Sequence, residues 1–282
     1  ATINEPWCVS WLSHYMGLHA PGLKSLSAAA KSMHLILVAH SEAIEVMRSF
    51  SHKNIGIVLN KEYCIPATTD YRDISACELY DEIYNIWFDE AIFKGRYPNR
   101  LLEIFEDFMP EHFESDLVKI SQKLDWIGIN YYTRAIVKAD VSEVNIGLKL
   151  IPGDLPKTDM GWEIFPNGLT KLLQRQKNDY SDNLPIHITE NGMADKDQLI
   201  NGQINDLKRI EYYLCHLKEI KTLLDQGLPI KSYFAWSLLD NFEWAFGFQK
   251  RFGLVYVDFS TQERTPKRSY YAFQKAFQTK NQ

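Results

Sequence analysis

Residues 184–192 read Leu-Pro-Ile-His-Ile-Thr-Glu-Asn-Gly. The apolar run from Ile186 to Ile188 lies between a proline and an Asn-Gly pair, a pattern typical of a buried strand that ends in a tight turn. The run ends on Glu190. An unpaired charge at the tip of a buried strand is costly. Glu190 is therefore either the first exposed residue after the strand or a residue held there for its chemistry.

The remainder of the chain alternates between strand and helix patterns. Such alternation predicts an α/β fold in which helical crossovers connect the strands of a parallel sheet. The charged residues Asp81, Glu82, Asp89 and Glu90 are expected on the solvated face of their helix. The expected elements are a strand end at 2–5, strands at 54–60, 126–132, 186–190 and 230–239, helices at 25–50, 75–93, 101–108, 167–176, 206–224 and 267–277, a loop at 139–161, and a hairpin arm at 251–259.

Composition excludes several classes of protein. The chain has 282 residues, of which 45% are hydrophobic, and a formal net charge of −5. No basic block favours nucleic-acid binding, and no apolar run reaches the roughly 18 residues of a membrane span. The four cysteines are sparse and unclustered, so we expect free thiols in a reducing, cytoplasmic compartment and no zinc or other metal site.

Polar side chains stand at the end of every expected strand. In a β/α barrel the carboxyl ends of the strands form the active-site face. Several consecutive strands that end in side chains able to bind or react are difficult to explain by structural needs alone. These side chains are Glu5; Asn60; Asn130, Tyr131 and Tyr132; Glu190; and Trp236, Asp240, Asn241, Glu243 and Trp244.

Two of these residues, Glu5 and Glu190, are carboxylates on different strands. Two facing carboxyl groups are the minimum needed to cleave a glycosidic bond: one protonates the leaving oxygen, and the other attacks the anomeric carbon or activates water. The residues alone leave both the retaining and the inverting mechanism open.

Four motifs together resemble glycoside hydrolase family 1, the retaining β-glucosidases. They are Thr-Ile-Asn-Glu-Pro (2–6), Ile-Gly-Ile-Asn-Tyr-Tyr (127–132), Ile-Thr-Glu-Asn-Gly (188–192) and Trp-Ser-Leu-Leu-Asp-Asn-Phe-Glu-Trp (236–244). The resemblance implies a (β/α)8 TIM barrel of which this chain supplies about strands 4–8, so that residues 1–282 form the C-terminal part of a single barrel domain and the N-terminal strands are missing.

The resemblance also implies roles for single residues. Glu5 would be the general acid/base, Glu190 the nucleophile, and Tyr132 the residue that orients the nucleophile. A non-proline cis peptide bond is frequent in the family after the residue corresponding to Trp236. No cofactor or metal is implied. The substrate-binding residues would be Asn4, Asn130, Trp162, Trp236, Glu243, Trp244 and Phe252.

The expected substrate is a terminal β-glucoside or a related β-glycoside, hydrolysed by double displacement. Residues 244–247, Trp-Ala-Phe-Gly, lack the Ser-rich, Lys-containing loop of 6-phospho-glycosidases, which favours a neutral sugar. The missing strands normally supply a Gln and a His-Trp pair to the sugar pocket, so the N-terminal portion of the same barrel is the expected partner. Two alternatives remain: an inactive fragment and a non-catalytic sugar-binding relative.

Overall fold

The computed structural model describes residues 1–142 and 146–279. Its main sheet has the strand order β1-β2-β4-β5, all pairs being parallel, and β3 pairs antiparallel with β2. The predicted parallel α/β architecture is therefore confirmed. The strands are β1 (Gly56–Pro66), β2 (Trp126–Ala139), β3 (Leu148–Ile151), β4 (Ile186–Asn191), β5 (Ile230–Ala235), and the separate antiparallel pair β6 (Val255–Val257) and β7 (Arg264–Pro266).

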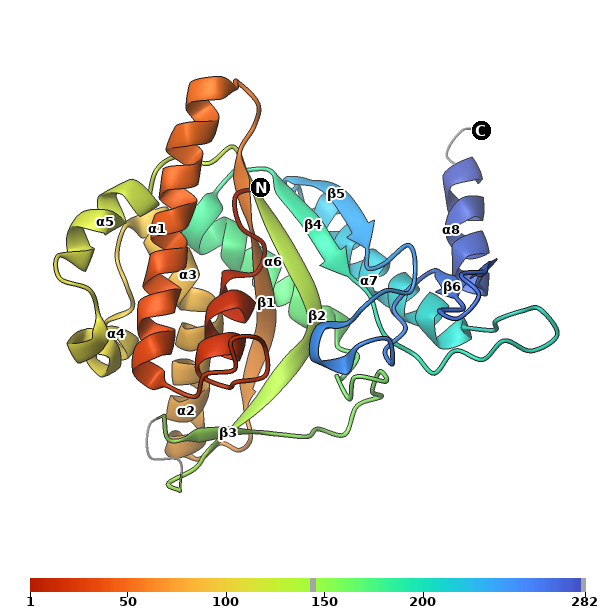
Figure 1. Ribbon diagram of the computed structural model, residues 1–282, viewed down its shortest axis with the longest axis horizontal. Helices are drawn as coiled ribbons and strands as arrows, with labels where there is room; N and C mark the ends of the chain where they lie inside the picture. Colours follow the sequence, from red (N-terminus) through yellow and green to blue (C-terminus); the bar gives the residue numbers. More distant parts are fainter. Residues whose placement is uncertain (143–145, 280–282) are drawn as a thin grey trace.

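Helices follow the strands and flank the sheet. Figure 1 shows α1 to α5 gathered beside β1, and α7, α8 and β6 on the side of β5. In the described ranges, no helix is both long and apolar enough to cross a bilayer. The helices are α1 (Leu26–Phe50), α2 (Tyr71–Asp81), α3 (Trp87–Lys94), α4 (Asn99–Phe105), α5 (Phe113–Ile120), α6 (Pro166–Arg175), α7 (Leu207–Asp225) and α8 (Arg268–Thr279), with π-helical turns at Cys8–Leu12, Glu82–Ile86 and Gln176–Ser181 and 3₁₀ turns at Glu106–Phe108 and Trp244–Phe246.

Local sequence explains where these helices begin and end. The side chain of Ser25 caps α1 by accepting a hydrogen bond from the backbone N–H of Ala28, and Asp70 caps α2 in the same way through Arg72. Such caps satisfy backbone donors that the first turn leaves unpaired. Helix α3 ends at Gly95, whose φ of 61° is left-handed and suits glycine.

The first residues of the chain run alongside β1. Asn4 forms a parallel bridge with Val58, and the N–H of Glu5 donates to the carbonyl of Val58 at 2.9 Å. The segment thus extends the sheet beyond β1 and places Glu5 at the carboxyl end of the strands. This agrees with the expectation that residues 2–5 end a strand.

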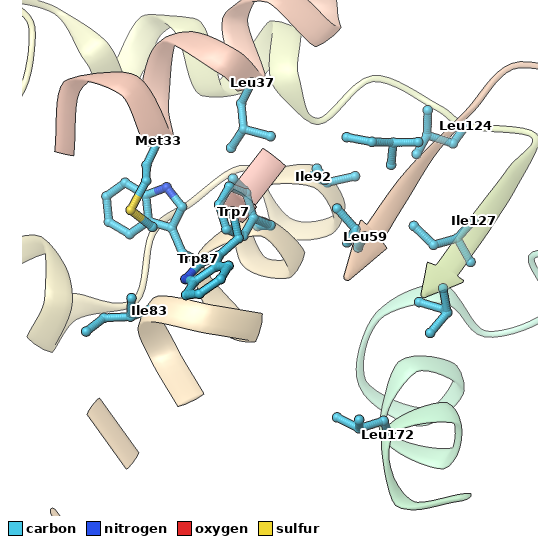
Figure 2. Close-up of a cluster of buried hydrophobic side chains, with 14 of the residues drawn as sticks. Trp7, Met33, Leu37, Leu59, Ile83, Trp87, Ile92, Leu124, Ile127 and Leu172 are labelled. Atoms are coloured by element: carbon cyan, nitrogen blue, oxygen red, sulfur yellow. The ribbon is translucent and has the colours of Figure 1, made fainter. Parts of the chain in front are cut away.

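The main core lies between the sheet and the helices on the β1 side. Figure 2 shows side chains of α1 and α3 meeting those of the strands. Trp87 stacks on Tyr97 with ring centroids 3.6 Å apart. Burying each large apolar side chain stabilises the fold by about 1.5–3 kcal/mol. Labelled members of this cluster are Trp7, Met33, Leu37, Leu59, Ile83, Trp87, Ile92, Leu124, Ile127 and Leu172.

The structure corrects several expected boundaries. β1 and β2 continue beyond the expected strands to Pro66 and Ala139, and β5 stops at Ala235 instead of 239. The expected loop 139–161 contains β3. β1 and β2 extend because they continue to pair with each other, and the far end of β2 also pairs with β3. The periodicity of one segment does not reveal such pairing.

The expectation of a solvated charged face on the 75–93 helix was wrong for two residues. Asp89 is 1% exposed and Glu90 is 7% exposed. Asp89 accepts a hydrogen bond at 2.6 Å from Lys61, which is also buried, and Glu90 pairs with Lys94 and Arg96. Helical spacing identifies which residues share a face, but it does not identify a cation contributed by a distant strand.

Candidate active site

Irregular register at the ends of three strands shapes the candidate site. The pairing of β1 with β2 shifts between Lys61 and Tyr63, and the pairing of β2 with β4 shifts between Ile129 and Asn130. The pairing of β4 with β5 shifts again between Ile188 and Asn191. Bulges of this kind bend a strand and re-aim its side chains. They turn the polar tips of β2 and β4 toward one another.

The side chain of Asn130 joins the strand ends. Its Nδ2 donates to Oε1 of Glu5 at 2.9 Å and to Oδ1 of Asn4 at 3.1 Å. Its Oδ1 accepts a 2.6 Å hydrogen bond from the hydroxyl of Thr189. Because that hydroxyl occupies the oxygen of the amide, the NH₂ group faces Glu5.

Both oxygens of Glu190 have donors. The hydroxyl of Tyr132 donates to Oε2 at 2.6 Å, and Nδ2 of Asn4 donates to Oε1 at 3.4 Å. Since Asn130 also contacts Asn4 and Glu5, a continuous hydrogen-bonded network connects the two carboxyl groups that the sequence singled out.

Burial sets the electrostatics of this network. Burial raises the pKa of Glu5, although the hydrogen bond from Asn130 opposes the rise. Burial, with the charge of Glu5 as a second cause, raises the pKa of Glu190 to about 7, and the bond from Tyr132 lowers it. The same two causes raise the pKa of Glu243 to about 7. Three neighbouring carboxyl groups therefore resist ionising together at neutral pH.

The segment after β5 forms another wall. The Trp236–Ser237 peptide bond is cis, as the resemblance implied. Gly192 packs so closely on this bond that a Cβ there would lie 1.9 Å from the carbonyl oxygen of Trp236. Trp244 is 67% exposed and stacks on His19 with centroids 5.4 Å apart.

A buried ionic cluster holds this segment in place. Oδ1 of Asp240 accepts hydrogen bonds from the Gly253 N–H at 2.9 Å and from Lys267 at 2.8 Å, and its Oδ2 accepts one from Arg251 at 2.7 Å. Lys267 also pairs with Asp197, from the loop after β4. The cluster therefore ties the two loops that follow β4 and β5 to the start of α8.

All the predicted site residues line one cavity of about 1120 Å³. The structure thus brings together side chains that are far apart in the sequence. Glu5 and Glu190 are only half-buried, because one side of each faces this space. The predicted residues on its walls are Asn4, Glu5, Asn130, Tyr132, Trp162, Glu190, Trp236, Glu243, Trp244 and Phe252.

Sequence reasoning missed two further groups. Glu62 and Cys8 line the same cavity, and the pair Lys267 and Asp197 supports it from behind. A signal for Glu62 existed: two consecutive charged residues, Lys61 and Glu62, follow the apolar stretch that ends at Asn60. No comparable signal marks Lys267, because its partners come from distant loops.

Comparison with known proteins identifies the family. The profile of Glycosyl hydrolase family 1 matches residues 1–282. The chain belongs to glycosyl hydrolase family 1. Among family 1 relatives, a beta-glucosidase from Agrobacterium sp. is 44% identical over 278 residues, covering 95% of this chain and 59% of that protein. Beta-glucosidase A from Thermotoga maritima is 41% identical over 274 residues, covering 96% and 61%.

Solved family 1 structures agree. A beta-glucosidase from Exiguobacterium marinum superposes with a TM-score of 0.94 at 38% identity, covering 99% of this chain and 64% of that one. The chain therefore spans about three fifths of the length of the family 1 relatives it matches.

Proposed function

We propose that the chain carries the catalytic pair of a retaining β-glycosidase that hydrolyses terminal β-D-glucosides. The observation that carries the proposal is the network in which Asn130 and Asn4 connect Glu5 to Glu190 across one cavity. Two carboxyl groups on different strands of one active-site face are what glycosidic cleavage requires. The family membership supports the same reaction.

The contacts support a division of labour between the two carboxyl groups. Glu190 receives hydrogen bonds from Tyr132 and Asn4, which stabilise its ionised form, so it attacks the anomeric carbon as nucleophile. Burial raises the pKa of both carboxyl groups, which therefore resist ionising together. With Glu190 held ionised by its two donors, Glu5 keeps the proton that the leaving oxygen takes. Once Glu190 is glycosylated its charge is gone, and Glu5 can lose a proton and activate water.

The proposal includes a barrel larger than the described sheet. Residues 1–282 would supply about strands 4–8 and the N-terminal portion of the same barrel the remainder of the sugar pocket. The length of the family 1 relatives supports this reading. Trp236 would form the floor of the pocket, Glu243 and Trp244 would bind glycone hydroxyls, and Trp162 and Phe252 would line its wall.

Azide rescue tests the catalytic pair in a protein that contains residues 1–282 together with the N-terminal portion of the barrel. With 4-nitrophenyl β-D-glucoside, Glu190→Gly should abolish hydrolysis, and azide should restore turnover with an α-glucosyl azide, because azide attacks from the side the nucleophile has left. Glu5→Ala should accumulate glycosyl-enzyme, which azide converts to the β-glucosyl azide. Normal activity of Glu190→Gly would contradict the assignment. So would a β-glucosyl azide from Glu190→Gly together with an α-glucosyl azide from Glu5→Ala.

The alternatives make different predictions for the same protein. An inverting enzyme would release α-glucose as its first product, which proton NMR distinguishes from β-glucose. A non-catalytic relative would bind deoxynojirimycin but would not turn over any substrate. The structure of the Thermotoga maritima beta-glucosidase in complex with this compound has been solved. An inactive fragment would neither bind the compound nor hydrolyse a substrate.

A further inference from the structure

Asn191 directly follows the proposed nucleophile and is fully buried. Its amide group bonds to three different elements. Nδ2 donates to the carbonyl oxygen of Tyr131 on β2 at 2.7 Å and to the hydroxyl oxygen of Tyr212 on α7 at 3.0 Å. Oδ1 accepts a 2.7 Å hydrogen bond from the hydroxyl of Tyr233 on β5. Because Tyr233 donates to the amide oxygen, the NH₂ group is directed at Tyr131 and Tyr212.

The hydroxyl of Tyr212 extends this connection to a residue of the site. It accepts from Asn191, so its own proton is free to be donated, and it donates to the carbonyl oxygen of Tyr132 at 3.2 Å. The side chain of Tyr132 in turn donates to Oε2 of Glu190 at 2.6 Å. The chain of contacts therefore starts next to Glu190, passes through Tyr212 and returns to the carboxylate through Tyr132.

Side chains take over from the backbone ladder at this point. The parallel pairing of β2 with β4 ends at Asn130 and Glu190, after a register shift. On the other side of β2, the pairing with β1 is interrupted at Tyr132 and Thr133. In the described part of the sheet, Tyr132 thus has no partner in either ladder. An irregular strand end needs other contacts to fix the direction of its side chain, and the Tyr212 hydroxyl supplies one.

Asn191 and Tyr212 act from behind the cavity wall. Glu190 faces the cavity, whereas Asn191 points to the opposite side of β4, toward α7, as consecutive strand residues do. Neither Asn191 nor Tyr212 is among the described residues that line the cavity. Their loss would therefore remove no contact with a ligand, and any effect on turnover must pass through residues that do line it.

We propose that Tyr212 and Asn191 are positioning residues that hold the phenol of Tyr132 at the angle from which it donates to Glu190. The inference rests on the proposed function of Glu190 as nucleophile. A fully paired buried polar network restricts a site to one arrangement, and small displacements of a reacting group lower its rate strongly. A purely structural network would stabilise the fold without changing the ionisation of Glu190, so the two roles differ in a measurable way.

The test measures kcat/KM for 4-nitrophenyl β-D-glucoside against pH, in a protein that contains residues 1–282 together with the N-terminal portion of the barrel. Tyr212→Phe removes one hydroxyl and keeps the ring. The acidic limb should move to higher pH by about 0.4–1 unit, because Glu190 loses part of the donation that favours its charged form. We expect kcat to fall about 3- to 10-fold and KM to stay within about 2-fold, since no ligand contact is lost.

A double-mutant cycle tests the path of the effect. In a Tyr132→Phe background the donor to Glu190 is already absent, so adding Tyr212→Phe should move the acidic limb no further. A full additional shift would overturn the proposal, because Tyr212 would then act on Glu190 without Tyr132. The donors to Glu5, whose charge also affects Glu190, stay in place in all these variants.

Tyr213→Phe is the matched control. Its hydroxyl lies one residue further along α7 and donates instead to the carbonyl oxygen of Trp236 at 3.1 Å, so its loss should leave the acidic limb in place. Tyr233→Phe is a second test variant. Without this donor the amide of Asn191 can turn, so the limb should move in the same direction as in Tyr212→Phe.

Three further results would overturn the positioning role: an unmoved acidic limb in Tyr212→Phe, an equal shift in Tyr213→Phe, or, if Tyr212→Phe fails to fold, an unmoved limb in Tyr233→Phe. Each of them leaves the catalytic pair intact, because the variants would still hydrolyse the substrate through Glu190. A wild-type protein inactive on the aryl glucoside would instead contradict the proposed function.

Discussion

The hydroxyl of Tyr132 donates to Oε2 of Glu190 at 2.6 Å, across the boundary between β2 and β4. The two residues meet because the register shift between Ile129 and Asn130 moves the tip of β4 relative to β2. Hydrogen bonds to an ionised carboxylate favour its charged form. Tyr132 therefore works against burial, which raises the pKa of Glu190.

Removing this hydroxyl should change the pH profile. In Tyr132→Phe the pKa of Glu190 should rise, so the acidic limb of the kcat/KM profile should move to higher pH, and kcat should fall about 10- to 100-fold for a lost bond to a charged group. Tyr131→Phe is the matched control, because the hydroxyl of Tyr131 bonds the carbonyl of Phe165 instead. An acidic limb that stays in place would show that Tyr132 does not tune Glu190.

Stability should depend on Glu243 between about pH 4.5 and 7. Burial raises the pKa of this carboxyl from its ordinary 4.5 to about 7. Between these values the unfolded chain has lost the proton and the folded chain still holds it, so the free energy of unfolding falls as pH rises. Glu243→Gln cannot ionise. Its Tm relative to wild type should therefore increase from pH 5 to 7.5, and a constant difference would contradict the assignment.

The ionic cluster around Asp240 should matter for both stability and sugar binding. Lys267→Met removes one of the two cations that each of Asp197 and Asp240 contacts, leaving Arg209 and Arg251 as their partners, and the loss of charged hydrogen bonds should cost about 1.5–3 kcal/mol. The segment carrying Trp236 should then be less well held, so KM should rise along with the loss of stability. Denaturant unfolding and steady-state kinetics measure the two effects.

A surface pair serves as the control for the cluster. Lys221 bonds Asp225 on the exposed side of α7, and Lys221→Met should change the free energy of unfolding by less than about 1 kcal/mol. If Lys267→Met were equally mild, the cluster would not be what holds the segment after β5.

Gly192→Ala should displace Trp236 and the segment after β5 directly. A Cβ at this position would meet the Trp236 carbonyl at 1.9 Å, so the backbone must shift, and we expect at least a 10-fold rise in the Kd of deoxynojirimycin. Gly202→Ala is the control: its φ of +74° is unfavourable for alanine, but nothing lies within 4 Å, so only a backbone cost of about 1 kcal/mol is expected. Calorimetric titration of both variants separates displacement of Trp236 from simple strain.

Much of the site was predictable because its residues stand at strand ends. Parallel strands bring their carboxyl ends to one edge, so Glu5, Asn130 and Glu190 were expected together, and the structure places them in one network. Glu62 was missed because β1 continues to Pro66, past the strand end expected at Asn60. The buried Asp89 was misread because its partner, Lys61, is 28 positions away.

The sequence by itself determined most of the strands and helices, since local periodicity, capping residues and turn residues act over a few positions. It also identified the strand-end side chains that line the cavity, but not Glu62 or Cys8. Only the tertiary structure decided which oxygen of each carboxyl group is bonded, which is left free in the cavity, and which charges are buried in pairs. Those outcomes depend on register shifts of one residue and on contacts between distant segments, such as Lys267 with Asp240. Pairing geometry sets them, and no single stretch of the chain encodes that geometry.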